Sequence, residues 1–88
     1  MDLELILEMA SECLALKPNL SPENPDGYDK AILGITDNGQ LVYSKEIMVD
    51  ILMQDDKEIS EEDAWEFLEF NTFNAYVGEQ TPIYVNTY

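Results

Sequence analysis

The strongest constraint on the fold is a pair of short apolar segments separated by a turn. The segments cover 30–36 and 40–43, and both are rich in β-branched or aromatic residues. Between them lies Asp-Asn-Gly at 37–39. Asn-Gly accepts the positive φ angles of a two-residue type I′ turn, whose twist matches that of paired strands. Residues 30–43 are therefore predicted to form a β-hairpin.

An amphipathic helix is predicted before the hairpin, over residues 2–16. Its apolar side chains recur at i, i+3, i+4 and i+7, and its carboxylates fall on the other side. Pro18 ends the helix, because a proline biases the preceding residue away from helical backbone angles. Cys13 lies on the apolar side, so we expect a small buried hydrophobic residue. Residues 18–28 are rich in Pro, Asn and Ser and are predicted to be a connecting loop.

Two more helices are predicted after the hairpin, each beginning at a serine. Ser44 and Ser60 are good N-cap residues, because a serine hydroxyl accepts a hydrogen bond from a free N–H of the first turn. In the first of these helices, over 45–54, Val49 and Met53 widen the apolar face beyond an ordinary stripe. That helix is therefore either covered on two sides or leaves apolar surface exposed.

The C-terminal segment alternates like a strand over 81–86. Pro82 cannot donate to a strand ladder, so it belongs at a strand start or at a sheet edge. Placed beside the hairpin, this strand gives a three-stranded antiparallel sheet packed against about three helices. The 88 residues, 1–88, are expected to form one α+β domain with the order α-β-β-α-α-β.

The charge of the chain limits its partners. Nineteen Asp and Glu residues face four Lys, with neither Arg nor His, and the formal net charge is -15. Such a surface repels nucleic acid and anionic membranes, so we expect basic partners, no direct nucleic acid binding and no membrane association. The hydrophobic fraction of 45% is too high for a disordered acidic tail. The N-terminus is acidic where a signal peptide is basic, which predicts a cytoplasmic protein.

Most catalytic arrangements are excluded by composition. There is no histidine for general acid–base chemistry, and one cysteine without histidine gives too few of the usual ligands for a zinc site. The densest acidic loop begins at Asp55, but an EF-hand needs an oxygen ligand at position 3 and glycine at position 6, where Lys57 and Ser60 stand. We therefore expect no enzyme, no cofactor and no dedicated metal site.

The best candidate for a functional surface is acidic and lies on the third predicted helix. From Glu46 to Glu69 there are ten acids and one Lys. Carboxylates at this helical spacing repel one another by a few tenths of a kcal/mol per pair, unless something basic docks on them. The alternative is a solvated face that serves solubility. The candidate partner-binding residues are Asp55, Asp56, Glu58, Glu61, Glu62, Glu66, Glu69 and Phe70.

Phe70 separates two interpretations of this helix. On a helical wheel Phe70 points into the acidic stripe, where an aromatic ring resembles an interface anchor with a charged rim. In the alternative, the helix ends by Glu69 and Phe70 turns into the core.

Three blocks resemble a family of small acidic bacteriophage and prophage proteins. They are ILGI…NGQLVY over 32–43, EDAWEFLEFNT over 62–72 and AYVGEQTP over 75–82. The resemblance implies a phage-type protein acting in a bacterial cytoplasm. It carries over no catalytic residue, and the further step to an inhibitor of host defence enzymes of the anti-CRISPR type rests on analogy.

Together these features favour a binding protein. The leading hypothesis is an inhibitor whose acidic surface blocks a basic, nucleic-acid-handling host protein, as an anti-CRISPR protein or DNA mimic does. One alternative is a structural or assembly protein, in which the surplus apolar face of the second helix forms a homo-oligomer. Another is adaptation to high salt, where acidity reflects the solvent.

Overall fold

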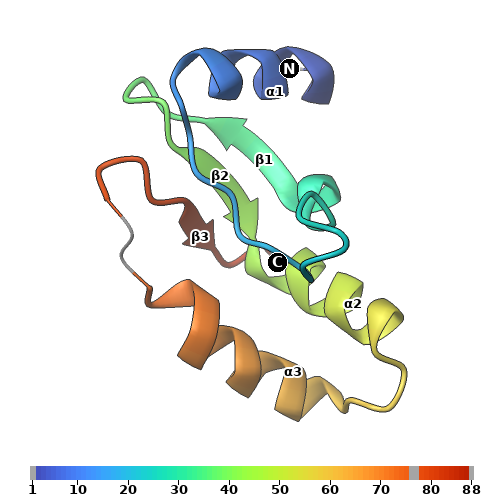
Figure 1. The fold of residues 1–88 in the computed structure, drawn as a ribbon. Helices are drawn as coiled ribbons and strands as arrows, with labels where there is room; N and C mark the ends of the chain where they lie inside the picture. Colours follow the sequence, from blue (N-terminus) through green and yellow to red (C-terminus); the bar gives the residue numbers. More distant parts are fainter. Residues whose placement is uncertain (1, 76–77, 88) are drawn as a thin grey trace.

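The computed structural model describes residues 2–75 and 78–87. It is an α+β structure in which helices pack around a three-stranded sheet (Figure 1). The predicted order of helices and strands is confirmed, with two short helical turns in addition. Along the chain the elements are α1 (Leu3–Glu12), the 3-10 turn η1 (Asp29–Ala31), β1 (Ile32–Ile35), β2 (Leu41–Ser44), α2 (Lys45–Asp55), α3 (Glu61–Leu68), the π-helical turn η2 (Glu69–Phe73) and β3 (Ile83–Val85).

The sheet is mixed, so the prediction of a purely antiparallel sheet is wrong. β1 pairs with β2 antiparallel, but β3 lies on the other side of β2 and runs parallel to it. α2 starts directly after β2 and carries the chain away from the sheet, and α3 returns beside α2 (Figure 1). The next strand therefore starts again where β2 began, and a helical crossover of this kind joins parallel strands. Pro82 stands just before β3, at the strand start as expected.

The hairpin is confirmed, but its turn is of another type. Thr36 donates its N–H to the carbonyl of Gln40 at 2.8 Å, and Gly39 donates to the carbonyl of Thr36 at 2.9 Å. Gly39 has φ 85°, whereas Asn38 is not among the described residues with positive φ. This is the three-residue loop in which a type I turn is followed by a left-handed glycine. The Thr36 hydroxyl favours it by accepting the Gln40 N–H at 3.0 Å.

α1 ends earlier than predicted, and Cys13 is exposed rather than buried. Ala15 donates its N–H to the carbonyl of Ala10 at 2.9 Å, and Leu14 donates to Ser11 at 3.2 Å. This hydrogen-bond pair is the Schellman motif, which needs a left-handed residue after the helix. Leu14 takes that position with φ 57°, so the helix stops well before Pro18.

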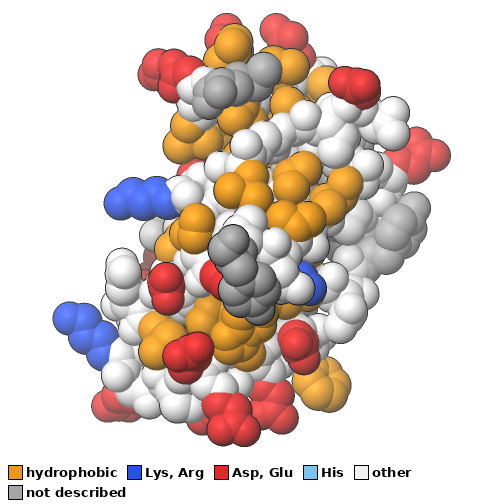
Figure 2. All heavy atoms as spheres, turned by 180° about the vertical axis from the view of Figure 1, so that it is seen from behind, with side chains coloured by type: hydrophobic (Ala, Val, Ile, Leu, Met, Phe, Trp, Pro, Cys, Tyr) orange, Lys and Arg blue, Asp and Glu red, His pale blue; other side chains and the backbone are white. Residues whose placement is uncertain are grey.

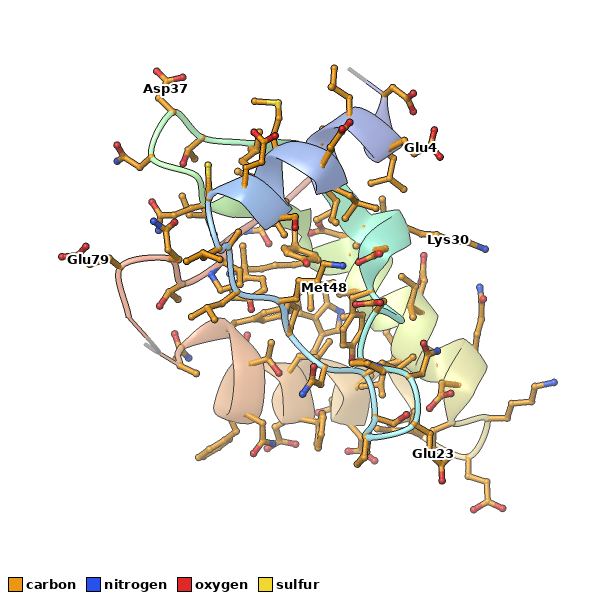
Figure 3. All side chains as sticks on the ribbon, turned by 45° about the horizontal axis from the view of Figure 1, so that its top comes forward. Glu4, Glu23, Lys30, Asp37, Met48 and Glu79 are labelled. Atoms are coloured by element: carbon orange, nitrogen blue, oxygen red, sulfur yellow. The ribbon has the colours of Figure 1, made fainter. Side chains whose placement is uncertain are left out.

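The hydrophobic core contains side chains from α1, the sheet, α2 and α3. Met48 lies at its centre (Figure 3), and Val49 beside it is only 2% exposed. Met53 is partly buried against the same cluster. The second predicted helix is thus covered on two sides, and the surplus apolar face proposed for self-assembly does not exist at Val49.

A chain of aromatic rings connects α3, η2 and the sheet. Trp65 contacts Phe73 at a centroid distance of 6.2 Å, Phe73 contacts Tyr84 at 5.1 Å, and Tyr84 contacts Tyr43 at 5.9 Å. These rings span α3, η2, β3 and β2, so they fix the orientation of α3 relative to the sheet. Ring pairs at such distances contribute about 1 kcal/mol each beyond their buried area.

The loop before the hairpin is held by Lys17. Its Nζ lies 3.1 Å from Asp26 Oδ1 and 3.1 Å from Asp29 Oδ1. Burial lowers the pKa of Lys17, but its hydrogen bonds to the two carboxylates outweigh this effect and raise the pKa above the ordinary value. The loop is therefore a tethered segment, and it delivers the fully buried Tyr28 to the core.

Leu14→Gly should stabilise the protein. A non-glycine residue in the left-handed region costs about 1–2 kcal/mol, and glycine loses about 0.4–1 kcal/mol more chain entropy on folding. We expect a gain of about 0.5–1 kcal/mol in the free energy of unfolding by urea denaturation. Leu16→Gly is the control, because Leu16 has negative φ and the change should destabilise. Equal effects of both substitutions would contradict the role of the Leu14 backbone.

Stability should fall as the pH rises from about 10 to about 12. Burial raises the pKa of Tyr28 and of Tyr84 from 10.0 to about 12, helped by Asp55 at Tyr28 and by Tyr28 at Tyr84, and it raises the pKa of Tyr43 as well. In this window the unfolded chain has lost its tyrosine protons and the folded chain has kept them, so deprotonation favours unfolding. Urea denaturation and tyrosinate absorbance at a series of pH values measure the effect.

Tyr43→Phe tests the assignment to buried tyrosines. The Tyr43 hydroxyl is buried without a hydrogen-bond partner among the described residues, so its removal should cost little at neutral pH. The variant should lose less stability than the natural protein above pH 10. An unchanged alkaline profile would contradict a contribution from Tyr43.

Candidate functional site

α3 turns one side to the core and the opposite side to solvent. Its N-cap is confirmed, because the Ser60 hydroxyl accepts the Asp63 N–H at 3.1 Å. Ala64 and Leu68, four residues apart, are fully buried and fix which side faces inward. The outward side of the helix carries exposed carboxylates, as the sequence predicted.

The predicted carboxylates are all exposed, but they do not form one cluster. Asp55 ends α2, Asp56 and Glu58 lie in the turn that follows, and Glu61 begins α3. Asp56 also has a structural role, since its Oδ1 accepts the Glu58 N–H at 3.2 Å. The outer stripe consists of Glu62 and Glu66 of α3 and Glu69, the first residue of η2.

The stripe forms no ion pair with a lysine of the described residues. Within residues 2–75 and 78–87, both ion pairs involve Lys17, which lies in the loop after α1. Lys45, at the start of α2, has its Nζ 5.2 Å from the centroid of the Phe73 ring, on the inner side of η2. Among the described residues, Glu62, Glu66 and Glu69 therefore take part in neither ion pair.

A π-helical turn presents Phe70 to solvent. α3 continues into η2, where Asn71 Nδ2 donates to the Phe67 carbonyl at 2.9 Å and Asn74 Nδ2 donates to the Glu69 carbonyl at 2.9 Å. Phe73 turns inward and joins the chain of core rings. Phe70 is 84% exposed. The interpretation in which Phe70 turns into the core is wrong, and the structure assigns that place to Phe73.

Phe67 is a surface aromatic residue that the sequence reasoning missed. It is 48% exposed and lies three residues before Phe70, about 60° away around the helix. Its i, i+3 relation to Phe70 was the signal that could have found it. We call Glu62, Glu66, Glu69, Phe67 and Phe70 together the acidic–aromatic surface.

A groove of about 290 Å³ opens beside Phe67. It lies between η2, the loop after α1 and the approach to β3, and Tyr84 contributes to its lining. Asn19 and Asn71 add amide groups. Lys17, tied to two carboxylates, is the charged group in the wall. The groove thus extends the acidic–aromatic surface with a partly apolar depression.

The chemistry of this surface suits recognition of cations, above all arginine. A guanidinium group stacks on an aromatic face and forms paired hydrogen bonds with a carboxylate. Within the described residues, no group of three or more His, Cys, Asp or Glu side chains is arranged to hold a metal ion.

Negative charge alone does not distinguish α3. Glu4, Glu23, Asp37 and Glu79 point outward from four other parts of the molecule (Figure 3). What distinguishes α3 is that exposed rings stand among its carboxylates. Any functional test must therefore compare α3 with an equally acidic surface elsewhere.

Comparison with known proteins gives no match to a family model, to a curated protein or to a solved structure. Among the residues that the structure describes, no helix is long and apolar enough to cross a membrane. Tyr76 and Val77, in the third block of the phage-type resemblance, lie outside the described residues.

Phe70→Ala should leave stability unchanged. The ring contributes little to the fold because it is 84% exposed, so the free energy of unfolding should change by less than about 0.5 kcal/mol. Phe73→Ala is the matched control and should cost about 2 kcal/mol or more, because Phe73 packs against Trp65 and Tyr84. Urea denaturation measures both. A large loss in Phe70→Ala would show that Phe70 belongs to the core.

Proposed function

We propose that this protein binds a basic, nucleic-acid-handling protein through the acidic–aromatic surface and thereby blocks its nucleic-acid site. The observation that carries the proposal is the exposed Phe70 ring among unpaired carboxylates. An exposed phenylalanine gains free energy when a partner covers it. The repulsion between neighbouring carboxylates is relieved by the same event.

The spacing of the stripe supports mimicry of nucleic acid. Steps of three and four residues along a helix rise about 4.5 and 6 Å, and DNA carries one charge per about 3.4 Å along each strand. An arginine that forms a paired contact with a phosphate forms the same kind of contact with a carboxylate. A surface that evolved to hold a phosphate backbone therefore has the donors needed to hold α3.

The proposed target is a host protein. The resemblance to small phage proteins supports an inhibitor of host defence, of the anti-CRISPR or DNA-mimic kind. In this proposal the protein is not an enzyme, because it acts by occupying a surface. The competing explanation is a solvated face that only keeps the protein in solution.

The experiment compares two triple variants with the same change of charge. Glu62, Glu66 and Glu69 are changed to Gln in one protein, and Glu4, Glu8 and Glu12 of α1 are changed to Gln in the other. All six side chains are exposed, and both sets form a helical stripe. The probe is the heparin-retained fraction of a bacterial lysate, which is enriched in basic nucleic-acid-binding proteins. Captured protein is quantified at ionic strengths of about 0.15 M and about 1 M, between which the screening length falls from about 8 Å to about 3 Å.

At low salt, we expect the α3 variant to capture at least about ten-fold less protein than the natural protein does. The α1 variant should capture as much as the natural protein. Phe70→Ala should weaken capture by a similar factor without changing the net charge. Captured proteins should release nucleic acid in proportion to the inhibitor added. Equal losses in both triple variants would show that total charge is responsible, and no loss in either would reject the acidic–aromatic surface.

A further inference from the structure

The groove beside Phe67 has the size of a site for one long side chain. Its volume of about 290 Å³ lies at the lower limit of ligand pockets, which begin at about 300 Å³. Phe67 and Tyr84 contribute rings to its lining, and Pro18 and Pro82 contribute aliphatic surface. Walls of this kind hold the carbon stem of a side chain, whereas a polar end group needs partners of its own.

The polar atoms that the groove leaves open are hydrogen-bond acceptors. Asn71 Nδ2 donates to the Phe67 carbonyl at 2.9 Å, which fixes the amide and leaves Oδ1 without a partner among the described residues. Asn19 adds a second amide to the lining. The ammonium of Lys17 is engaged by Asp26 and Asp29 at 3.1 Å each. The groove therefore offers oxygen acceptors to a ligand, while its strongest donor is already used.

A carboxylate stands next to Phe67 on the same side of the helix. Asp63 precedes Phe67 by four residues, and side chains at this spacing are neighbours, with Cβ atoms about 5–6 Å apart. Asp63 is exposed, and neither ion pair of the described residues includes it. Asn71 is held next to Phe67 in the following turn by its bond to the Phe67 carbonyl. A carboxylate, an aromatic ring and an amide oxygen thus follow one another along this side of α3 and η2.

The Phe67 ring is open to a cation from outside. It is 48% exposed, and no ring pair of the described residues includes it. The ammonium of Lys45 lies over Phe73 instead. The chain has no arginine of its own. A guanidinium group over Phe67 must therefore come from another molecule.

Negative charge surrounds this end of the molecule and favours a cation in the groove. Figure 2 shows the molecule from behind, with hydrophobic side chains standing among acids over its lower end, where α3 lies in Figure 1. Inside the groove, the charge of Lys17 is exceeded by that of the two carboxylates bound to it. An incoming cation is attracted by this field, and an anion is repelled.

We propose that the groove holds an arginine side chain of the basic partner, an inference that rests on the proposed function. The guanidinium group lies flat on the Phe67 ring, and its N–H groups donate to the Asp63 carboxylate and to Asn71 Oδ1. The carbon stem lies against the prolines of the wall. An apolar side chain would leave the acceptors unpaired, and a lysine has no planar group that stacks on the ring. The groove is thus specific for arginine, whereas the glutamate stripe attracts any cation.

Short peptides test the groove separately from the rest of the acidic–aromatic surface. The probes are acetyl-Gly-Arg-Gly-amide and the same peptide with citrulline, lysine or phenylalanine in place of arginine; citrulline keeps the shape of arginine but has no charge. Amide-resolved NMR titration at an ionic strength of about 0.15 M gives the dissociation constants. We expect the arginine peptide to shift the side-chain amide signals of Asn19 and Asn71 and to bind at about 1 mM, and each other peptide to bind at least about five-fold more weakly.

Two pairs of variants locate the bound arginine. Phe67→Ala should weaken binding of the arginine peptide at least about five-fold, whereas Leu5→Ala on α1, where the side chain is 47% exposed, should leave it within about two-fold. Asp63→Asn should also weaken it at least about five-fold. Asp37→Asn makes the same change of charge in the hairpin turn, far from α3 (Figure 3), and should have an effect of less than about two-fold. Circular dichroism verifies that each variant is folded.

Three results would overturn the arginine site. Equal binding of the lysine or phenylalanine peptide would show that the groove does not select a guanidinium group. Equal losses in Asp63→Asn and Asp37→Asn would show that net charge alone is responsible. A loss in Phe70→Ala without one in Phe67→Ala would place the arginine on the outer ring instead of in the groove.

The failure of this inference is distinguishable from the failure of the proposed function. Heparin-retained proteins that are captured through Glu62, Glu66 and Glu69, without any binding of the arginine peptide, would overturn the arginine site and leave the proposed function standing. An arginine peptide that binds and is lost in Phe67→Ala, without any captured protein, would support the arginine site and reject the proposed function.

Discussion

The junction between β2 and α2 at Ser44 determines how the chain is arranged. Ser44 is the last residue of β2, is fully buried, and caps α2 by accepting the Ile47 N–H at 3.2 Å. Because no loop separates strand from helix, α2 leaves along a fixed direction and α3 must return beside it. The same hydroxyl bonds Thr87, whose N–H donates to Glu46 at 2.7 Å. One buried serine thus joins the central strand, the second helix and the chain after β3.

This arrangement separates two surfaces of opposite character. α3 turns its carboxylates and the rings of Phe67 and Phe70 to solvent, whereas the sheet turns an uncharged aliphatic face to another side. In a chain of net charge -15, contact with a cation relieves repulsion and contact with another acid increases it. The first surface therefore fits a basic partner.

Local sequence signals were sufficient to locate those structural features that depend on interactions within a few residues. The Asn-Gly pair located the hairpin, and Ser44 and Ser60 located two helix starts. The turn type was missed because the Thr36 hydroxyl stabilises a three-residue loop that the Asn-Gly rule does not consider. The end of α1 was missed because a leucine, Leu14, takes a left-handed position that glycine usually occupies. The helical wheel placed Phe70 among acids. No local pattern in the sequence indicated the π-helical turn that directs the Phe73 ring inward.

The sequence by itself determined the α+β class, the order of the elements, the acidity and the exposed side of α3. These properties follow from composition, hydrophobic period and capping, which depend on neighbours along the chain. Only the tertiary structure decided the parallel pairing of β3, the burial of Val49 and the pairing of Val42 with Ile83. Strand neighbours and uncovered faces depend on contacts between residues some forty positions apart, and alternation along one short strand does not specify which of its sides another layer covers.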